Sequence, residues 1–505
     1  MLTGSESGVF AIIALAAFSI LAWGFTRSRR FGRVGLLAWL QTVVLMAPWL
    51  LFFGLFAFGV VINLAGILLL LLVSVALYIY LGTRLRQAAA NMKGEKTSPL
   101  TLESSTRSEK EDATKDQSSP ETTVTAEEPV LARIDPEELG TVRSIFSVDT
   151  FFATETIPYE EGAIFRGNLR GEPEKVHTQL SRRLTEKVGD KYRLFLVENA
   201  EQKPVVVLLP SSRDPRTTTL AQKNLAVVLF IALVATCCET GGLLLGFDWF
   251  SNLGRFAEVL PLVSGLIAVL VTHEIAHWVV AQRHNVKLSI PFFLPSWQIG
   301  AFGAITRFES LLRNRTTLFD ISFAGPAAGG ALSLFFLVVG LSLSQPDSGF
   351  RIPSEFLQSS ILVGSLARVV LGSDVVQQVL VEVNLLTVVG WLGLVITALN
   401  LLPAGQLDGG RIVQAVYGRQ TARRTTIATL IVLAIVTLLN PANPIPLYWA
   451  AIILFLQREL ERPSLNELTE PSDTRAAWGL LLLFLMLATL VPLSPSLAGR
   501  LGIGG

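Results

Sequence analysis

The stretch that decides the fold is VLPLVSGLIAVLVTHEIAHWVVA, residues 259–281. A bilayer core of roughly 30 Å is crossed by about 20 apolar residues of helix, and this stretch is long enough. Near its end stand His273, Glu274 and His277. Ionisable side chains inside a membrane helix are costly unless a partner such as a metal compensates them. The stretch therefore predicts a membrane helix that carries a polar site.

The spacing of these three residues indicates a metal site. Positions i and i+4 of a helix share one face, so the imidazoles of His273 and His277 can reach the same ion. Glu274 lies between them, close enough to take a proton from a water molecule that the metal activates. An incidental polar patch is the alternative, and the apolar surroundings make it the weaker one. We therefore predict a zinc site with Glu274 as the catalytic base.

A third ligand must come from farther along the chain. One known extension of this motif needs a glycine and a third histidine at positions that Val280 and Arg283 occupy here. Downstream carboxylates remain, and Asp408 stands in NLLPAGQLDGG, residues 400–410, at the end of another apolar span. The Pro and Gly residues of that stretch would also suit a simple helix-terminating turn. Loop charges place Asp408 and the histidines at similar depth, which favours Asp408 as a ligand.

Composition excludes several classes of protein. Of the 505 residues 51% are apolar and only 16% are charged, which is too apolar for an ordinary soluble protein. The net charge of +1 implies no basic surface for nucleic acid. The two cysteines, Cys237 and Cys238, are adjacent, so a disulfide scaffold is not expected.

The apolar runs predict about ten membrane helices and four regions. Residues 1–87 hold about three helices, 88–133 form a disordered linker, 134–215 form a soluble α+β module, and 224–495 form a membrane core. The spans are expected at Val9–Phe25, Val34–Leu81 (a helical hairpin), Leu225–Gly246, Val259–Ala281, Phe319–Leu343, Val383–Leu402, Ile427–Leu439, Ile445–Leu456 and Ala476–Val491.

Basic residues orient these spans, because Lys and Arg accumulate in cytoplasmic loops. Arginines follow the first and third spans, precede Phe319 and Ile427, and follow Leu456. One assignment fits every loop: the N-terminus lies outside, and the linker, the module and the site face the cytoplasm. The membrane would be an inner, plasma or thylakoid-type membrane, with the stroma equivalent to the cytoplasm in the last case.

The soluble module shows one clear helix. Val176, Leu180, Leu184 and Val188 recur every four residues and predict an amphipathic helix of roughly 16 residues. Strands are expected at Tyr192–Glu198 and Pro204–Leu209, on either side of a turn. His177 lies on the polar helix, and we expect it at the surface rather than on a metal.

These motifs together resemble those of the site-2 proteases, which cut transmembrane helices inside the bilayer. The resemblance runs from about Leu225 to the C-terminus. The motifs that carry it are His273-Glu274-x-x-His277 within a span, Gly325-Pro326, and Asn400-x-x-Pro403 leading to Asp408-Gly409. In the module, Gly167-Asn-Leu-Arg-Gly171 and Gly189–Phe195 look like the branch found in photosynthetic bacteria and chloroplasts.

The resemblance implies a fold and a site. The fold would be a polytopic all-α membrane protein with a site-2 protease-type helical core, a re-entrant strand-like loop and the small α+β module. One Zn²⁺ per chain would be held by His273, His277 and Asp408, and Asn400 would contact the substrate backbone or the developing oxyanion. The partners would be transmembrane protein substrates and the lipid bilayer, and the oligomeric state stays open.

The re-entrant loop is expected within Ser289–Glu309, which is too short and Pro-broken for a spanning helix. Irregular backbone at membrane depth is tolerated where it lines a cavity. The resemblance implies that this loop, with Gly300 and Gly303, pairs with an unwound substrate. An ordinary cytoplasmic loop is the alternative.

Two other functions compete with proteolysis. A metal-ion transporter would need further ligands along a path, and mid-span only Glu239 is available. We interpret Glu239 as lying near a helix break at Gly241-Gly242, and the alternative is that it supports the metal ligands from behind. An inactive protease fold that acts as a binding protein would show a degraded motif, whereas this one is intact.

Overall fold

The structure, a computed structural model, describes residues 134–493 except 160, 200, 297, 346–349, 373–377, 442 and 458, with scattered residues between 25 and 84. The chain divides into two units, Met1–Thr125 and Ala126–Gly505. The helices expected before residue 88 are described only in part, as in the short 3₁₀ helix η1 (Arg29–Phe31). The linker expected at 88–133 lies outside the described residues.

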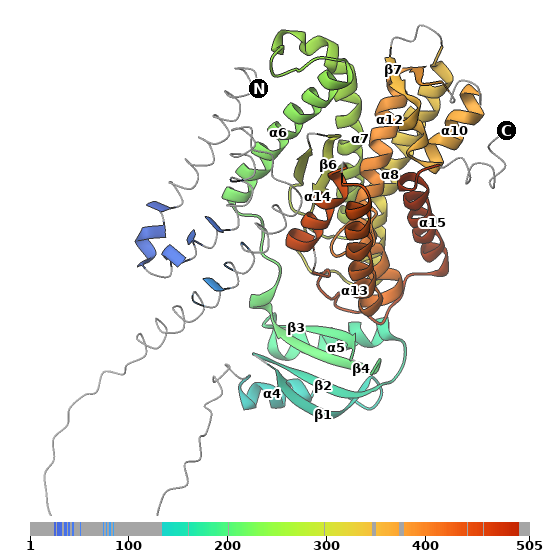
Figure 1. Ribbon diagram of the computed structural model, residues 1–505. Helices are drawn as coiled ribbons and strands as arrows, with labels where there is room; N and C mark the ends of the chain where they lie inside the picture. Colours follow the sequence, from blue (N-terminus) through green and yellow to red (C-terminus); the bar gives the residue numbers. More distant parts are fainter. Residues whose placement is uncertain are drawn as a thin grey trace, which may run out of the picture. The chain divides into compact units, whose positions relative to one another are not determined.

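Five helices of the second unit are long and apolar enough to cross a membrane. They are α6 (Leu220–Leu244), α7 (Phe256–Arg283), α8 (Arg315–Leu343), α13 (Asp408–Leu439) and α15 (Asp473–Leu490). Three apolar helices are shorter: α10 (Ile361–Leu371), α12 (Leu385–Asn400) and α14 (Ile445–Ile452), the last continuing into a π-helical turn, η4 (Ile453–Gln457). Helix α8 packs against both α7 and α12 (Figure 1). The chain is thus a multi-pass membrane protein, as predicted.

The outer surfaces of these helices are apolar. Val227 and Ile231 on α6, Ile431 and Ile435 on α13, and Phe484 on α15 are each at least half exposed. A soluble protein rarely leaves such an apolar surface in water. Lipid is the solvent that this surface suits.

The structure differs from the expected spans in two places. Helix α13 begins at Asp408, well before Ile427, and Gly418, with φ 81°, interrupts it. Its early part is rich in arginine and so has no apolar signal. The stretch after α8, expected to be a loop, contains β7 (Phe350–Pro353), α9 (Ser354–Gln358), α10 and β8 (Leu380–Val383). Helix α10, with 11 residues, is too short to cross a membrane.

The expected strand-like loop is present. Strands β5 (Phe292–Ser296) and β6 (Gly300–Ile305) form an antiparallel hairpin in which Phe292 pairs with Ile305. The hairpin packs against α6, and β6 also contacts α12. Gly300 and Gly303 have φ values of 81° and 107°, which other residues rarely adopt. These two glycines therefore let β6 follow its path.

The soluble module is a four-stranded sheet in the order β1-β2-β4-β3, with helices α4 (Pro136–Arg143) and α5 (Pro173–Val188). The predicted strands are present as β3 (Tyr192–Glu198) and β4 (Pro204–Pro210). The predicted helix is present as α5, with Val176, Leu180 and Leu184 buried and Val188 partly exposed. Strands β1 (Phe151–Tyr159) and β2 (Gly162–Leu169) were not predicted. The module leads through the 3₁₀ turn η2 (Ser211–Arg213) to α6, while the 3₁₀ turn η3 (Leu253–Arg255) precedes α7.

The expectation for His177 is wrong. The side chain is buried, and its Nε2 lies 3.2 Å from the carbonyl oxygen of Leu194 on β3. His177 follows Val176 on the helix and lies at the margin of the apolar stripe, where the sheet covers it. It serves the packing of the module.

A segment far along the chain joins the module to the membrane core. Leu196 of β3 donates to the carbonyl of Leu465 at 2.8 Å, and Glu467 donates back to the carbonyl of Leu196 at 2.9 Å. On its other side the segment donates from Leu465 to the carbonyl of Leu312, just before α8. We call residues 464–467 the bridging segment, because it extends the module sheet and holds it to the core.

Candidate metal centre

Helix α7 brings His273 and His277 to one buried face. Their Nε2 atoms are 3.1 Å apart, and Nδ1 of His277 lies 2.7 Å from the carbonyl oxygen of Ile321 on α8. A carbonyl can only accept, so Nδ1 of His277 carries the hydrogen. In the neutral imidazole Nε2 is then left with a free lone pair, as a metal ligand requires.

Asp408, the first residue of α13, completes the group. Its Oδ2 lies 3.1 Å from Nε2 of His273 and 3.4 Å from Nε2 of His277. Atoms bound tetrahedrally to one zinc at about 2.0 Å are roughly 3.3 Å from one another. The three atoms therefore have the separation that a shared zinc ion demands, and all three belong to ligand types that zinc prefers.

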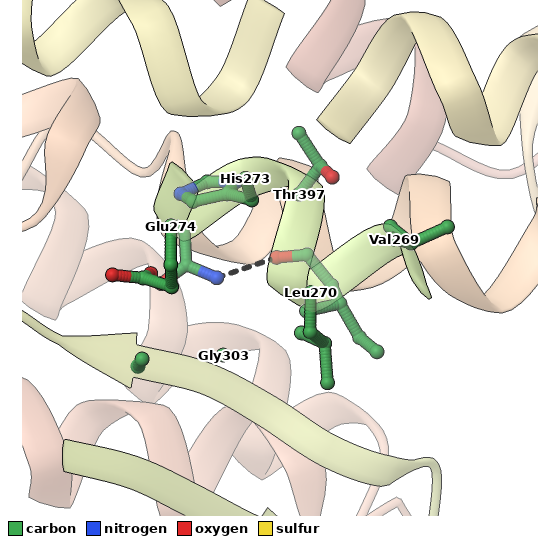
Figure 2. Close-up of a pocket in the computed structure, with 9 residues that line it drawn as sticks. Val269, Leu270, His273, Glu274, Gly303 and Thr397 are labelled. Atoms are coloured by element: carbon green, nitrogen blue, oxygen red, sulfur yellow. Dashed lines mark hydrogen bonds between the residues drawn. The ribbon is translucent and has the colours of Figure 1, made fainter. Parts of the chain in front are cut away.

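The side chain of Glu274, on α7, lies on the side of the helix that faces the strand carrying Gly303. Glu274 and Gly303 both line a small cavity (Figure 2). One of its carboxylate oxygens lies within 4.8 Å of the ligating nitrogens of the two histidines. The hydroxyl of Thr306, just after β6, donates to Oε2 of Glu274 at 2.7 Å. The carboxylate is thus held beside the candidate ligand atoms of the two histidines.

Helix α8 passes so close to the histidines that small residues are required. A Cβ on Gly325 would stand 2.2 Å from Nε2 of His277, and one on Gly329 would stand 3.1 Å from Cβ of His273. Gly325, the first residue of the Gly325-Pro326 pair, thus meets a steric need of the site.

Asn400, the last residue of α12, lines the same cavity. Its Nδ2 donates to the carbonyls of Phe302 on β6, at 3.2 Å, and of Ile396, at 2.9 Å. Both amide hydrogens are used within the protein. The amide oxygen is therefore the atom of Asn400 that can meet a substrate.

Glu239 does not join this group. Its Oε2 accepts from the backbone N–H groups of Trp249 and Phe250, at 3.1 and 3.3 Å, and so closes the loop after α6. The helix continues through Gly241 and Gly242 to Leu244, so the expected break there is wrong. The two glycines instead allow close packing, since a Cβ on Gly242 would stand 2.8 Å from the carbonyl oxygen of Phe247.

Two residues near the site were missed in the sequence. Thr306 contacts Glu274, and Arg411 donates to the carbonyl oxygen of Thr306 at 2.9 Å. Neither belongs to a motif with its own spacing. Arg411 is the more predictable of the two, because it follows the proposed ligand Asp408 by three residues. An arginine buried there needs a partner.

Comparisons with known proteins place this site in a family. The model of peptidase family M50 matches residues 261–439, which include every residue of the site. A relative from Arabidopsis thaliana, named "Probable zinc metalloprotease EGY1, chloroplastic", is 35% identical over 409 residues, which cover 74% of each chain.

The chain belongs to peptidase family M50. This confirms the family that the motifs of the sequence indicated. The module of this M50 chain matches a second model, the EGY3 middle domain, over residues 140–215.

Two further relatives carry similar names. "Probable zinc metalloprotease EGY2, chloroplastic" from Arabidopsis thaliana is 37% identical over 370 residues, 71% of this chain and 66% of the relative. Its namesake from Oryza sativa subsp. indica is 37% identical over 354 residues, 69% and 64% of the two chains. The M50 chain thus spans slightly less than two thirds of these two relatives. No solved structure matches it.

Proposed function

We propose that this M50 chain is an intramembrane zinc metalloprotease that hydrolyses peptide bonds of transmembrane substrates near the cytoplasmic or stromal leaflet. One observation carries the proposal. Three ligand atoms, from His273, His277 and Asp408, lie 3.1–3.4 Å from one another among apolar helices, with Glu274 beside them. The names of the relatives, zinc metalloproteases, agree with it.

The residues divide the chemistry among themselves. His273, His277 and Asp408 would hold one zinc ion, which when bound polarises a carbonyl and lowers the pKa of a water molecule to about 7. Glu274 accepts the proton that this water loses. Ile321 fixes the tautomer of His277, so the ligand set is oriented before any substrate arrives.

The depth of the site fits an intramembrane reaction. His273 precedes the end of α7 at Arg283 by ten residues, or about 15 Å of helix. Water must therefore reach the site from that end. Arg283 and Arg313 flank this end, and basic residues favour the cytoplasmic side. The relatives are named chloroplastic, and in a plastid membrane the proposed side would be the stromal one.

A substrate helix must unwind before cleavage, because its amides are already hydrogen-bonded. Strand β6 pairs with β5 on one side, and its residues Gly303 and Ala304 line the cavity on the other. We propose that the substrate adds to β6 as a further strand. The amide oxygen of Asn400 would accept a backbone N–H of the substrate, a role that suits its geometry better than binding an oxyanion.

The competing functions lack comparable support. A transporter needs ligands along a path, but Glu239 accepts hydrogen bonds from the loop after α6. Glu239 stands near the level of Val259 on α7, because a Cβ on nearby Gly241 would be 3.2 Å from Cβ of Val259. His273 is 14 residues farther along α7 (273 − 259), or about 21 Å. A purely binding role would not need Glu274 to be held beside a complete ligand set.

The module would lie at the active-site face and restrict which substrates approach. Its attachment through the bridging segment, and the bond that Arg462 donates to the carbonyl of Arg213 at 2.9 Å, support this position. We assign the module no part in the hydrolysis itself.

The test uses purified full-length chain in vesicles with a panel of single-span helices that carry a dye and a quencher. We expect about one zinc per chain and cleavage of at least one helix. Glu274→Gln should keep the zinc and lose cleavage, because glutamine cannot accept the proton, whereas Asp408→Ala should lose both. Cleavage that survives Glu274→Gln, or zinc that stays in a His273→Ala, His277→Ala double variant, would contradict the proposed function.

A further inference from the structure

The carboxylate of Glu274 has a partner that the proposed reaction does not yet use. The hydroxyl of Thr306 donates to its Oε2 at 2.7 Å. Thr306 follows β6, so the strand proposed to receive the substrate also ends in the group that contacts the base. This bond leaves the second carboxylate oxygen, Oε1, to accept a proton.

The backbone carbonyl of Thr306 is itself held by a buried arginine. Arg411 on α13 donates from Nη2 to the carbonyl oxygen of Thr306 at 2.9 Å and from Nε to Glu461 at 3.0 Å. The side chains of Arg411 and Glu461 are only 8% and 9% exposed. The Arg411 guanidinium also lies over the ring of Phe308, 4.8 Å from its centre. Both Nε and Nη2 of Arg411 contact the same carboxylate oxygen, Oε2 of Glu461. A buried ion pair of this kind fixes geometry more than it adds stability.

Glu461 is anchored in turn by main-chain bonds. Its N–H donates to Oε1 of Gln414 at 3.0 Å, and Nε2 of Gln414 donates to its carbonyl at 3.1 Å. Gln414 and Arg411 are on the same helix as Asp408. Helix α13 therefore sets both the proposed metal ligand and, through Thr306, the direction of Glu274.

From this geometry, and given the proposed role of Glu274 as the base, we propose that Thr306 is a positioning residue for the reaction. Its hydroxyl fixes the rotation of the Glu274 carboxylate, so that Oε1 faces the reacting water. Arg411 and Glu461 hold Thr306 in place. Loss of such orientation slows the chemical step and leaves substrate binding unchanged, since the hydroxyl is already committed to Glu274.

The test compares variants that differ in the hydroxyl group. Thr306→Val keeps the shape and removes the donor, and Thr306→Ser restores the donor. With the best-cleaved helix of the vesicle panel, we expect Thr306→Val to lower kcat about 10- to 100-fold with KM within about twofold. Thr306→Ser should recover most of kcat, and both variants should keep one zinc per chain.

The controls separate positioning from folding. Thr489, whose hydroxyl donates to the carbonyl of Leu485 within α15, gives the matched Thr489→Val, which should leave kcat unchanged. If Thr306→Val does not fold, Thr306→Ala takes its place. Wild-type kcat in a folded variant without the hydroxyl would overturn the inference, as would a loss of zinc that accompanies the loss of activity.

The same series distinguishes this inference from the proposed function. Glu274→Gln is assayed beside it. An inactive Glu274→Gln with a fully active Thr306→Val would reject the positioning role and keep Glu274 as the base. An active Glu274→Gln would reject the proposed function itself.

Discussion

Replacing Gly325 by alanine should empty the metal site without weakening the helix. The new Cβ would stand 2.2 Å from Nε2 of His277, whereas an ordinary contact needs at least 3.4 Å. The imidazole must therefore move by about 1.2 Å (3.4 − 2.2), when metal–ligand distances tolerate only about 0.2 Å. Displacing a ligand should cost more than the tenfold to 100-fold in affinity typical of an outer-shell change. We expect a loss of at least about 100-fold.

Two neighbours on α8 provide matched controls. A Cβ on Gly329 would lie 3.1 Å from Cβ of His273, and one on Gly330 would meet only Cγ2 of Thr397, at 3.5 Å. Alanine favours a helix over glycine by about 1 kcal/mol, so helix stability should rise in all three variants. Zinc affinity, measured by titration of the purified chain with competing chelators, should fall in the order Gly330→Ala, Gly329→Ala, Gly325→Ala. Wild-type affinity in Gly325→Ala would refute the packing of α8 against His277.

Four further outcomes are expected. Burial lowers the pKa of His177 below its usual value, so below about pH 6.5 the unfolded module binds a proton more readily than the folded module does. The free energy of unfolding of the module should therefore fall as the pH drops below about 6.5, which pulse proteolysis in urea can measure. The fall should be smaller in His177→Gln. Glu239→Ala should loosen the loop after α6, seen as faster hydrogen exchange at Trp249, while zinc content stays the same. Deleting residues 88–133 should leave cleavage largely intact. Arg170→Ala should change which helices of the vesicle panel are cleaved more than it changes the zinc content. A metal-free but folded Arg170→Ala variant would place the module in the catalytic centre.

The sequence predicts helix α7 well because the information that specifies this helix is local. The spacing of His273 and His277 and the apolar length around them fix a helix, a face and a depth. The prolines and glycines of residues 289–309 exclude a spanning helix for the same reason, but the strand-like form of β5 and β6 was expected only from the resemblance to the site-2 proteases. The prediction of Asp408 as a ligand needed a second step, in which the charges of the loops indicated that Asp408 and the two histidines lie at the same depth in the membrane.

Other features depend on contacts between distant segments. Strand β1 has a mixed pattern of exposure, with Phe152 exposed and Pro158 near its end, so it shows no clean alternation. His177 is buried because the module sheet packs against α5. Glu239 accepts hydrogen bonds because the loop after α6 folds back toward it. Thr306 and Arg411 meet from segments about 100 residues apart, and no local pattern marks such a pair.

The bridging segment has a consequence for how the chain is made. Leu196 on β3 is synthesised 271 residues before Glu467, its hydrogen-bond partner (467 − 196). At roughly 5–20 residues per second, the ribosome needs about 14–54 s to supply that partner. During this time β3 is an open sheet edge, which is a site for unwanted strand pairing. The module is thus completed only after most of the membrane helices have been made, and ribosome-bound chains that stop before residue 465 should expose β3 to proteases and chaperones.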